Sequence, residues 1–179
     1  MITGLERIAQ NKLKYPESKH LNLIHYVNVE NLKGAYKRIN GKKATGTDKV
    51  SKDEYGKDLE ANLNQLVARM KTFSYRPQPT KRVYIPKAGS NKLRPLGIPS
   101  FEDKLVQNIM ADVLSEIYEP IFYDFSYGFR KDRDCHKAIE HLSEMIHRNK
   151  VNYIVDADIK GFFDNVCLLY TSPSPRDCS

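Results

Sequence analysis

The 179-residue sequence lacks the features of membrane-spanning and secreted proteins. It contains no run of about 18 apolar residues, so no helix is predicted to cross a membrane. Residues 1–20 contain no apolar segment, and we expect no secretory signal. The three cysteines form no C-x-x-C pair and show no zinc-ligand spacing, which argues against a zinc site or a disulfide framework. A cytoplasmic protein is therefore expected.

The sequence also lacks the common catalytic signatures. It has no P-loop, no G-x-G-x-x-G turn, and no Ser-His-Asp or Cys-His arrangement. The five histidines show no metal-ligand pattern, and we interpret them as side chains on solvated helix faces. Any chemistry must therefore come from carboxylates and basic side chains.

Positive charge is concentrated in the middle of the chain. The net charge is +7, and residues 67–104 carry nine basic and two acidic residues. Residues 105–179 carry eight basic and twelve acidic residues. This distribution indicates a polyanion-binding surface beside a carboxylate-rich site. A basic face that only contacts solvent is the alternative.

The pattern of apolar residues predicts an α+β fold that is mostly helical, with a β-hairpin and short strands. Ser51 and Ser100 are suited to begin helices, because a serine side chain can accept a hydrogen bond from a free amide of the first turn. In the last predicted helix, Ala138, Leu142, Met145 and Ile146 are expected to be buried. The predicted elements are helices over 5–14, 29–39, 53–72, 101–118 and 135–148, a hairpin over 80–98, and a strand over 151–159.

The segment D-A-D-I-K-G-F-F-D, residues 156–164, contains the clearest candidate site. Side chains alternate along a strand, so Asp156 and Asp158 are expected on one face. Carboxylates at the end of an apolar strand are costly without a positive partner, and Mg²⁺ prefers such oxygen ligands. A solvated acidic turn is the alternative interpretation.

Two further segments carry basic side chains. In the predicted hairpin, Lys87 and Arg94 lie on either side of the turn and could reach one anion, with Lys81, Arg82 and Lys92 nearby. A lysine-rich edge strand that stays soluble through its charge is the alternative. In SYGFRKDR, aromatic residues alternate with Arg130 and Arg133, a pattern suited to nucleic acid or to packing against the core.

Four segments, taken together and in order, resemble the N-terminal part of a group II intron-encoded reverse transcriptase/maturase. IPK, LRPLGIP, SYGFR and DIKGFFD are each weak alone, but they are specific in this order and spacing. The resemblance covers about residues 20–166. The segments are KKATGTDKV, YRPQPTKRVYIPKAGSNKLRPLGIPSFEDKLVQNIM, YEPIFYDFSYGFRKDRDCHKAI and VDADIKGFFDNV.

The resemblance implies a right-hand polymerase in a bacterial cytoplasm. Residues 1–150 would form the fingers with an N-terminal extension, and residues 151–166 the first palm strand. The implied partners are an intron RNA template, a DNA primer and dNTP, with no membrane, and a homodimer of the full-length protein is a further expectation.

Residue roles follow from the same resemblance. Asp158 would be the catalytic carboxylate that binds two Mg²⁺ ions, with the main chain of Ile159 beside them. The nucleotide would contact Lys87, Arg94, the main chain of Lys160, and Phe163, which would pack against its sugar. The residues implied to contact nucleic acid are Lys42, Lys43, Lys81, Arg82, Arg130 and Arg133.

The sequence departs from the family in two respects. The Y-x-D-D motif, which supplies further metal-binding carboxylates in this family, does not occur, so we expect no polymerase activity from this chain alone. After Val166 the sequence reads CLLYTSPSPRDCS, which we interpret as a translated sequencing adapter. A natural Ser- and Pro-rich C-terminus is the alternative.

Two other functions remain open. The chain could be a stand-alone RNA-binding finger module without catalysis. It could also be a fragment of a retron or diversity-generating reverse transcriptase. Continuation of the natural reading frame into Y-x-D-D would distinguish a polymerase from the binding module.

Overall fold

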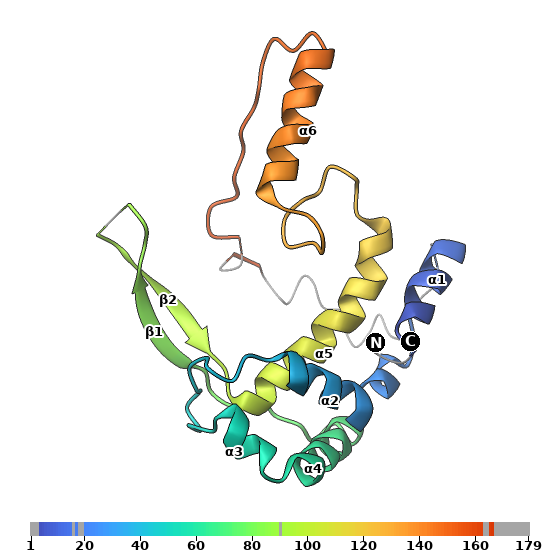
Figure 1. The fold of residues 1–179 in the computed structure, drawn as a ribbon, viewed down its shortest axis with the longest axis vertical. Helices are drawn as coiled ribbons and strands as arrows, with labels where there is room; N and C mark the ends of the chain where they lie inside the picture. The colour runs from blue at the N-terminus through green and yellow to red at the C-terminus, as the bar shows by residue number, and fades with distance from the viewer. Residues whose placement is uncertain (1–3, 16, 18–19, 90, 163–164, 167–179) are drawn as a thin grey trace. The chain divides into compact units, whose positions relative to one another are not determined.

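The structure is a computed structural model that describes residues 4–15, 17, 20–89, 91–162 and 165–166. Internal contacts divide the chain into two compact units, residues 1–126 and 127–179, and each is described by itself (Figure 1). The division predicted at residue 150 concerns the parts of a polymerase and remains a prediction.

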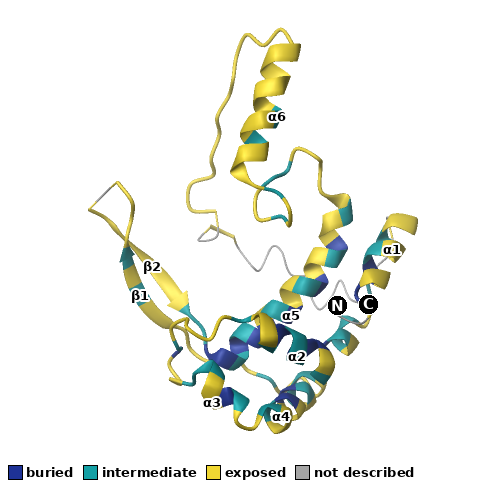
Figure 2. Cartoon of the chain, viewed as in Figure 1, coloured by how far each residue is buried: buried dark blue, intermediate teal, exposed yellow. Residues whose placement is uncertain are grey.

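Three helices form the core of the first unit. Helices α2 (Val29–Arg38), α4 (Leu59–Lys71) and α5 (Phe101–Tyr118) bury their apolar stripes against one another (Figure 2). At the other end of α5, helix α1 (Glu6–Lys14) completes a second cluster. Helix α5 contributes to both clusters, so it is the central element of this unit. The fully buried side chains include Leu32, Leu63, Leu66, Leu105 and Ile109.

Side-chain caps begin the helices where the sequence predicts them. Ser51 Oγ accepts a hydrogen bond from the Glu54 amide at 3.1 Å, and Ser100 Oγ accepts one from the Asp103 amide at 3.1 Å. Asn28 caps α2 in the same way. Each cap satisfies an amide that has no partner inside its helix.

The helix predicted over 53–72 is two helices in the structure. Helix α3 (Lys52–Gly56) ends in a turn, and α4 begins at Leu59. A Cβ atom at Gly56 would collide with the Tyr36 hydroxyl, which donates to the Lys52 carbonyl at 3.1 Å. The Asn62 side chain closes the turn by donating to the Tyr55 carbonyl. The break follows a glycine, which is a weak helix former, and the close fit of Gly56 to Tyr36 is a contact that the local sequence pattern does not show.

The predicted hairpin is present as strands β1 (Lys81–Pro86) and β2 (Leu93–Ile98). They pair antiparallel with Ile85 opposite Arg94 and Val83 opposite Leu96. In the turn, Gly89 has φ 72°, a left-handed conformation that favours glycine. Pro86 and Pro95 are tolerated because both strands are edge strands.

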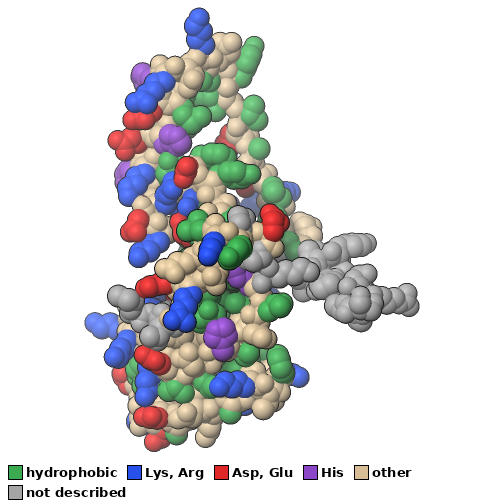
Figure 3. Space-filling view, turned by 90° about the vertical axis from the view of Figure 1, so that its right-hand side faces the viewer, with side chains coloured by type: hydrophobic (Ala, Val, Ile, Leu, Met, Phe, Trp, Pro, Cys, Tyr) green, Lys and Arg blue, Asp and Glu red, His purple; other side chains and the backbone are tan. Residues whose placement is uncertain are grey.

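The second unit contains the amphipathic helix α6 (Cys135–Arg148), which Asp134 caps. Its expected burial is wrong: Ala138 is half-buried, and Leu142, Met145 and Ile146 are exposed (Figure 2). An apolar stripe is buried only where another element packs against it. In the space-filling view, this unit has charged and histidine side chains along one edge and hydrophobic side chains along the other (Figure 3).

The strand predicted over 151–159 is absent. These residues are described without regular structure, and Tyr153 and Val155 are 90% and 88% exposed. A β-strand needs a neighbouring strand for its hydrogen bonds. Within the described residues the sheet consists of β1 and β2 alone, so residues 151–159 have no such neighbour.

The fold is therefore α+β, as predicted: roughly half of the chain is helical, and the described residues contain one two-stranded antiparallel sheet. The remaining short elements are the 3₁₀ helices η1 (Leu23–Tyr26) and η2 (Glu119–Ile121). Among the described residues, no helix is both long enough and apolar enough to span a bilayer.

Replacing Leu105 with alanine should destabilise the first unit by about 2–5 kcal/mol, because Leu105 is fully buried and the change leaves a cavity. The matched control is Leu114→Ala on the same helix, where the side chain is 46% exposed and the loss should be smaller. Urea unfolding followed by circular dichroism measures both. Equal losses would contradict the packing of α5 described above.

Candidate nucleotide and nucleic-acid interface

The first turn of α5 forms hydrogen bonds with α3, with α4 and with the segment that leads into the hairpin. Arg69 Nη2 lies 2.7 Å from both carboxylate oxygens of Glu102, and the Tyr55 hydroxyl donates to the same carboxylate at 3.4 Å. Burial, followed by the charge of Glu102, raises the pKa of the Tyr55 hydroxyl. The hydroxyl therefore stays protonated at neutral pH and keeps its role as a donor. These contacts join α3, α4 and α5.

Asp103 is the buried carboxylate of this turn and is 3% exposed. It accepts hydrogen bonds from the Tyr75 hydroxyl and from the Gln78 amide, the latter at 3.0 Å. Burial and the contact with Asp103 raise the pKa of the Tyr75 hydroxyl, so it also remains a donor. Because residues 75–78 lead directly into β1, Asp103 anchors the chain that enters the hairpin.

Lys87 and Arg94 lie on one face of the hairpin, close to its turn. Opposed residues share a face and side chains alternate along each strand, so Ile85, Arg94 and Lys87 point to the same side. The Lys87 amide donates to the Lys92 carbonyl at 2.9 Å and continues the ladder beyond β1. Diagonal partners of this kind are about 7–8 Å apart, a spacing at which two cations can reach one polyphosphate.

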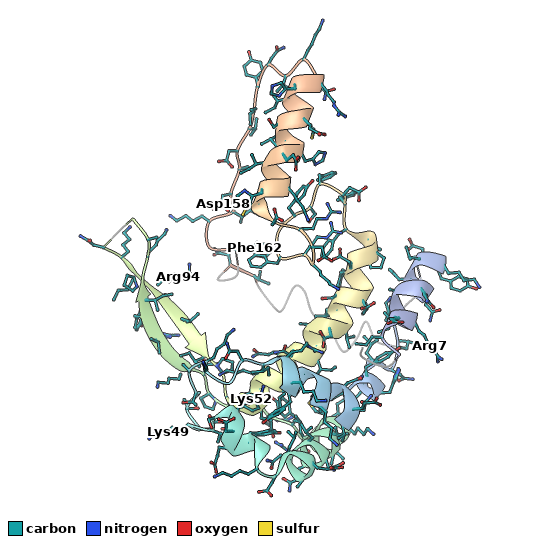
Figure 4. All side chains as sticks on the ribbon, viewed as in Figure 1. Arg7, Lys49, Lys52, Arg94, Asp158 and Phe162 are labelled. Carbon is teal, nitrogen blue, oxygen red and sulfur yellow. The ribbon has the colours of Figure 1, made fainter. Side chains whose placement is uncertain are left out.

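The other two hairpin residues predicted to bind nucleic acid are separated by the same alternation. Lys81 belongs to the face of Lys87 and Arg94, at the far end of β1, whereas Arg82 belongs to the opposite face. The side chains of Lys81, Arg82, Lys87 and Arg94 are all exposed. Arg94 is labelled on the hairpin in Figure 4.

The basic loop, residues 40–50, lies against the base of the hairpin. Gly46 is buried, and a Cβ atom there would lie 2.7 Å from the Pro99 carbonyl oxygen. Thr47 Oγ1 donates to the Pro79 carbonyl at 2.8 Å. Lys42 and Lys43, the predicted nucleic-acid contacts, are exposed in this loop. The fold therefore brings the basic loop next to the start of β1, where Lys81 and Arg82 lie.

The aromatic and arginine segment belongs to the second unit. The Tyr127 hydroxyl lies 2.8 Å from His141 Nδ1, and the Arg133 guanidinium lies 5.2 Å from the centre of the Tyr127 ring. Arg130 and Arg133 are both half-buried. The interpretation of all histidines as solvated is wrong for His141, because this residue is half-buried and bonded to a tyrosine 14 positions away.

Asp156 and Asp158 lie in the exposed segment that follows α6 (Figure 4). Ile159, Lys160 and Phe162 are exposed too, and Gly161 has φ 62°. The Asn165 amide and side chain donate to the Gly161 carbonyl at 3.1 and 2.8 Å. Phe163, the predicted contact for the nucleotide sugar, lies outside the described residues.

The described residues do not build a metal centre by themselves. They contain no group of three or more histidine, cysteine, aspartate or glutamate side chains placed to hold an ion. Mg²⁺ prefers about six oxygen ligands and commonly takes one or two carboxylates together with water and substrate phosphates. Metal binding by Asp158 and Ile159 therefore needs ligands from elsewhere and remains a prediction.

Sequence reasoning missed the residues that anchor the site. Gly46 packs against Pro99, and the Thr47 hydroxyl donates to the Pro79 carbonyl. The Lys104 ammonium donates to the Ala44 carbonyl at 2.6 Å, 60 positions away. A local pattern shows a flexible turn at Gly46, whereas the fold buries this glycine. No periodicity or motif could have indicated these pairings.

Comparison with known proteins identifies the family. Residues 85–170 match the profile of the family described as reverse transcriptase (RNA-dependent DNA polymerase). The group II intron-encoded protein LtrA of Lactococcus lactis is 36% identical over 163 residues, which is 90% of this chain and 27% of LtrA. Protein YkfC of Escherichia coli is 35% identical over 129 residues, covering 70% of this chain and 34% of that protein.

A yeast relative extends the similarity beyond bacteria. The putative COX1/OXI3 intron 1 protein of Saccharomyces cerevisiae is 30% identical over 151 residues, which is 84% of this chain and 18% of that protein. The chain thus spans only 18–34% of the length of these relatives. Together with the motifs IPK and LRPLGIP in the matched region, these similarities show that the chain belongs to the reverse transcriptase family, among the proteins encoded by group II introns.

Proposed function

We propose that this chain forms the fingers and the start of the palm of a right-hand RNA-directed DNA polymerase. The observation that carries the proposal is the hairpin, which presents Lys87, just after β1, and Arg94, in β2, on one face. A lysine and an arginine at this spacing can neutralise the charge of one triphosphate. In this role they would hold the incoming dNTP, with Lys160 and Phe163 as further contacts.

The basic loop and the base of the hairpin would bind the nucleic acid. Lys42, Lys43, Lys81 and Arg82 are exposed cations on neighbouring segments, and they would contact phosphates without reading base sequence. Arg130 and Arg133 would add contacts from the second unit. The proposed partners are intron RNA and a DNA primer. A homodimer of the longer protein remains a prediction.

Asp158 is the residue of this chain that we propose for catalysis. In two-metal polymerisation, carboxylates hold ions that activate the primer hydroxyl and stabilise the leaving pyrophosphate. Asp158 is exposed and could contribute one such carboxylate, with the Ile159 main chain beside it. The Y-x-D-D carboxylates are not in this sequence, so the chain alone should bind nucleic acid without extending a primer.

Replacing Lys42 and Lys43 together with glutamine should weaken RNA binding by this chain and lower its salt dependence. Loss of two phosphate contacts on single-stranded RNA should reduce the slope of log K against log salt by about 1.4. Fluorescence anisotropy at several salt concentrations measures the slope. The control is the pair Lys14→Gln and Lys71→Gln, which removes the same charge from exposed positions on helices α1 and α4. Equal slopes for both pairs would exclude the basic loop as a binding site.

Charge reversal at Lys87 and Arg94 should raise the KM for dNTP about tenfold or more while changing RNA affinity less, because the pair is proposed to hold the triphosphate. Primer-extension kinetics would be measured in a polymerase that contains this chain together with a Y-x-D-D segment. Reversal of Lys81 and Arg82, which are proposed to contact nucleic acid, is the comparison and should lower RNA affinity more than it raises the KM. Equal effects on KM and RNA affinity would make Lys87 and Arg94 general backbone contacts instead.

In the same polymerase, Asp158→Asn should abolish Mg²⁺-dependent extension and leave RNA binding intact, because an amide keeps the shape of the side chain but loses its charge. Asp156→Asn tests the neighbouring carboxylate as a control. Extension retained by Asp158→Asn would remove this residue from its proposed catalytic role.

A further inference from the structure

The basic loop has an ordered backbone although its composition predicts flexibility. The Lys42 amide donates to Asn40 Oδ1 at 2.9 Å, the Lys49 amide to the Gly46 carbonyl at 3.3 Å, and the Val50 amide to Asp48 Oδ1 at 3.3 Å. These are turns within the loop. They shape it locally, but they do not fix its position on the rest of the unit.

Contacts with residues outside the loop hold it at its start and in its middle. At its start, the Lys52 ammonium donates to the Ile39 carbonyl at 2.7 Å, and Gly41 packs on the Lys52 side chain. In its middle, the Lys104 ammonium holds the Ala44 carbonyl, and Gly46 packs against Pro99. Lys49 and Lys52 are labelled in Figure 4.

Thr47 makes the contact that reaches the hairpin. Its hydroxyl donates to the Pro79 carbonyl, two residues before Lys81. Thr47 is exposed and lies outside both apolar clusters, so its side chain contributes nothing to the core. The hydrogen bond therefore joins the segment that carries Lys42 and Lys43 to the segment that carries Lys81 and Arg82.

We propose that Thr47 is a positioning residue for RNA binding, and that its hydroxyl holds the basic loop against the hairpin so that the two groups of cations form one prearranged surface. The inference rests on the RNA-binding function proposed above. Ordering a loop before binding avoids a loss of conformational entropy on binding. Without the hydrogen bond, the same lysines would still reach the phosphates, but the loop would have to be ordered each time.

The test compares Thr47→Val with Thr47→Ser in the full chain. Valine keeps the shape and removes the donor, whereas serine keeps the donor and removes the methyl group. Thr47→Val should lower the affinity for single-stranded RNA about three- to tenfold, the range for one lost hydrogen bond. The slope of log K against log salt should stay at the wild-type value, since every cation is retained. Thr47→Ser should bind like the wild type.

A second measurement, made without RNA, separates positioning from direct contact. In the free chain, trypsin should cleave after Lys42 and Lys43 faster in Thr47→Val than in the wild type or in Thr47→Ser. Thermal unfolding should change only slightly in Thr47→Val, because one exposed hydrogen bond is lost and the core is unchanged, and it should be the same in Thr47→Ser as in the wild type. Weaker RNA binding with unchanged cleavage would mean that the hydroxyl contacts RNA itself, which would overturn the proposal.

The two proposals fail in different ways. If the wild-type chain shows no salt-dependent RNA binding, or if the Lys42 and Lys43 variant keeps the wild-type slope, the proposed function of the loop fails. If that variant behaves as expected but Thr47→Val binds and is cleaved like the wild type, only the positioning role of Thr47 is overturned. Weak binding by Thr47→Ser would also overturn it, because the methyl group would then be the important part.

Discussion

The first turn of α5 is the constraint on which the first unit depends. Ser100 caps the helix, Glu102 holds Arg69, and the buried Asp103 carboxylate accepts hydrogen bonds from Tyr75 and Gln78. A buried carboxylate is costly unless its oxygens are bonded, and here both are. The position of this carboxylate near the positive end of a helix dipole also favours the charge. Removing a partner would leave an unsatisfied buried charge.

This turn connects the core with the surface that we propose for binding. On one side, Phe101 lies among the aromatic rings of Tyr36 and Tyr55. On the other, residues 75–79 lead into β1, and Pro99 receives Gly46 of the basic loop. The exposed cations of the hairpin and the loop therefore belong to segments that contact the buried first turn of α5 and its neighbours. Charged side chains on such a support need less ordering when they bind a polyanion.

The second unit leaves apolar side chains exposed among its described residues. The Tyr127–His141 contact joins the aromatic segment to α6, but the apolar stripe of α6 and residues 151–159 remain exposed. Asp158 accordingly lies in a segment whose position no ladder of hydrogen bonds determines. Lys87 and Arg94 are different, because the register of the hairpin determines which face they occupy.

The sequence by itself determined the features that depend on neighbours a few residues apart. The caps at Ser51 and Ser100, the apolar stripe of α5 and the hairpin with Lys87 and Arg94 are all local patterns, and the structure contains each of them. The family, too, could be recognised from the order of short motifs, because such motifs are read without knowing the fold.

Only the tertiary structure decided the features that depend on distant partners. Tyr36 packs against Gly56 at the break between α3 and α4, and among the described residues the α6 stripe stays exposed and residues 151–159 have no strand partner. The basic loop shows this most clearly. Its composition predicts flexibility, but contacts from Lys104, Pro99 and Pro79 hold it in place. Hydrogen bonds across 32 and 60 positions leave no periodic trace in a sequence, because nothing local requires them.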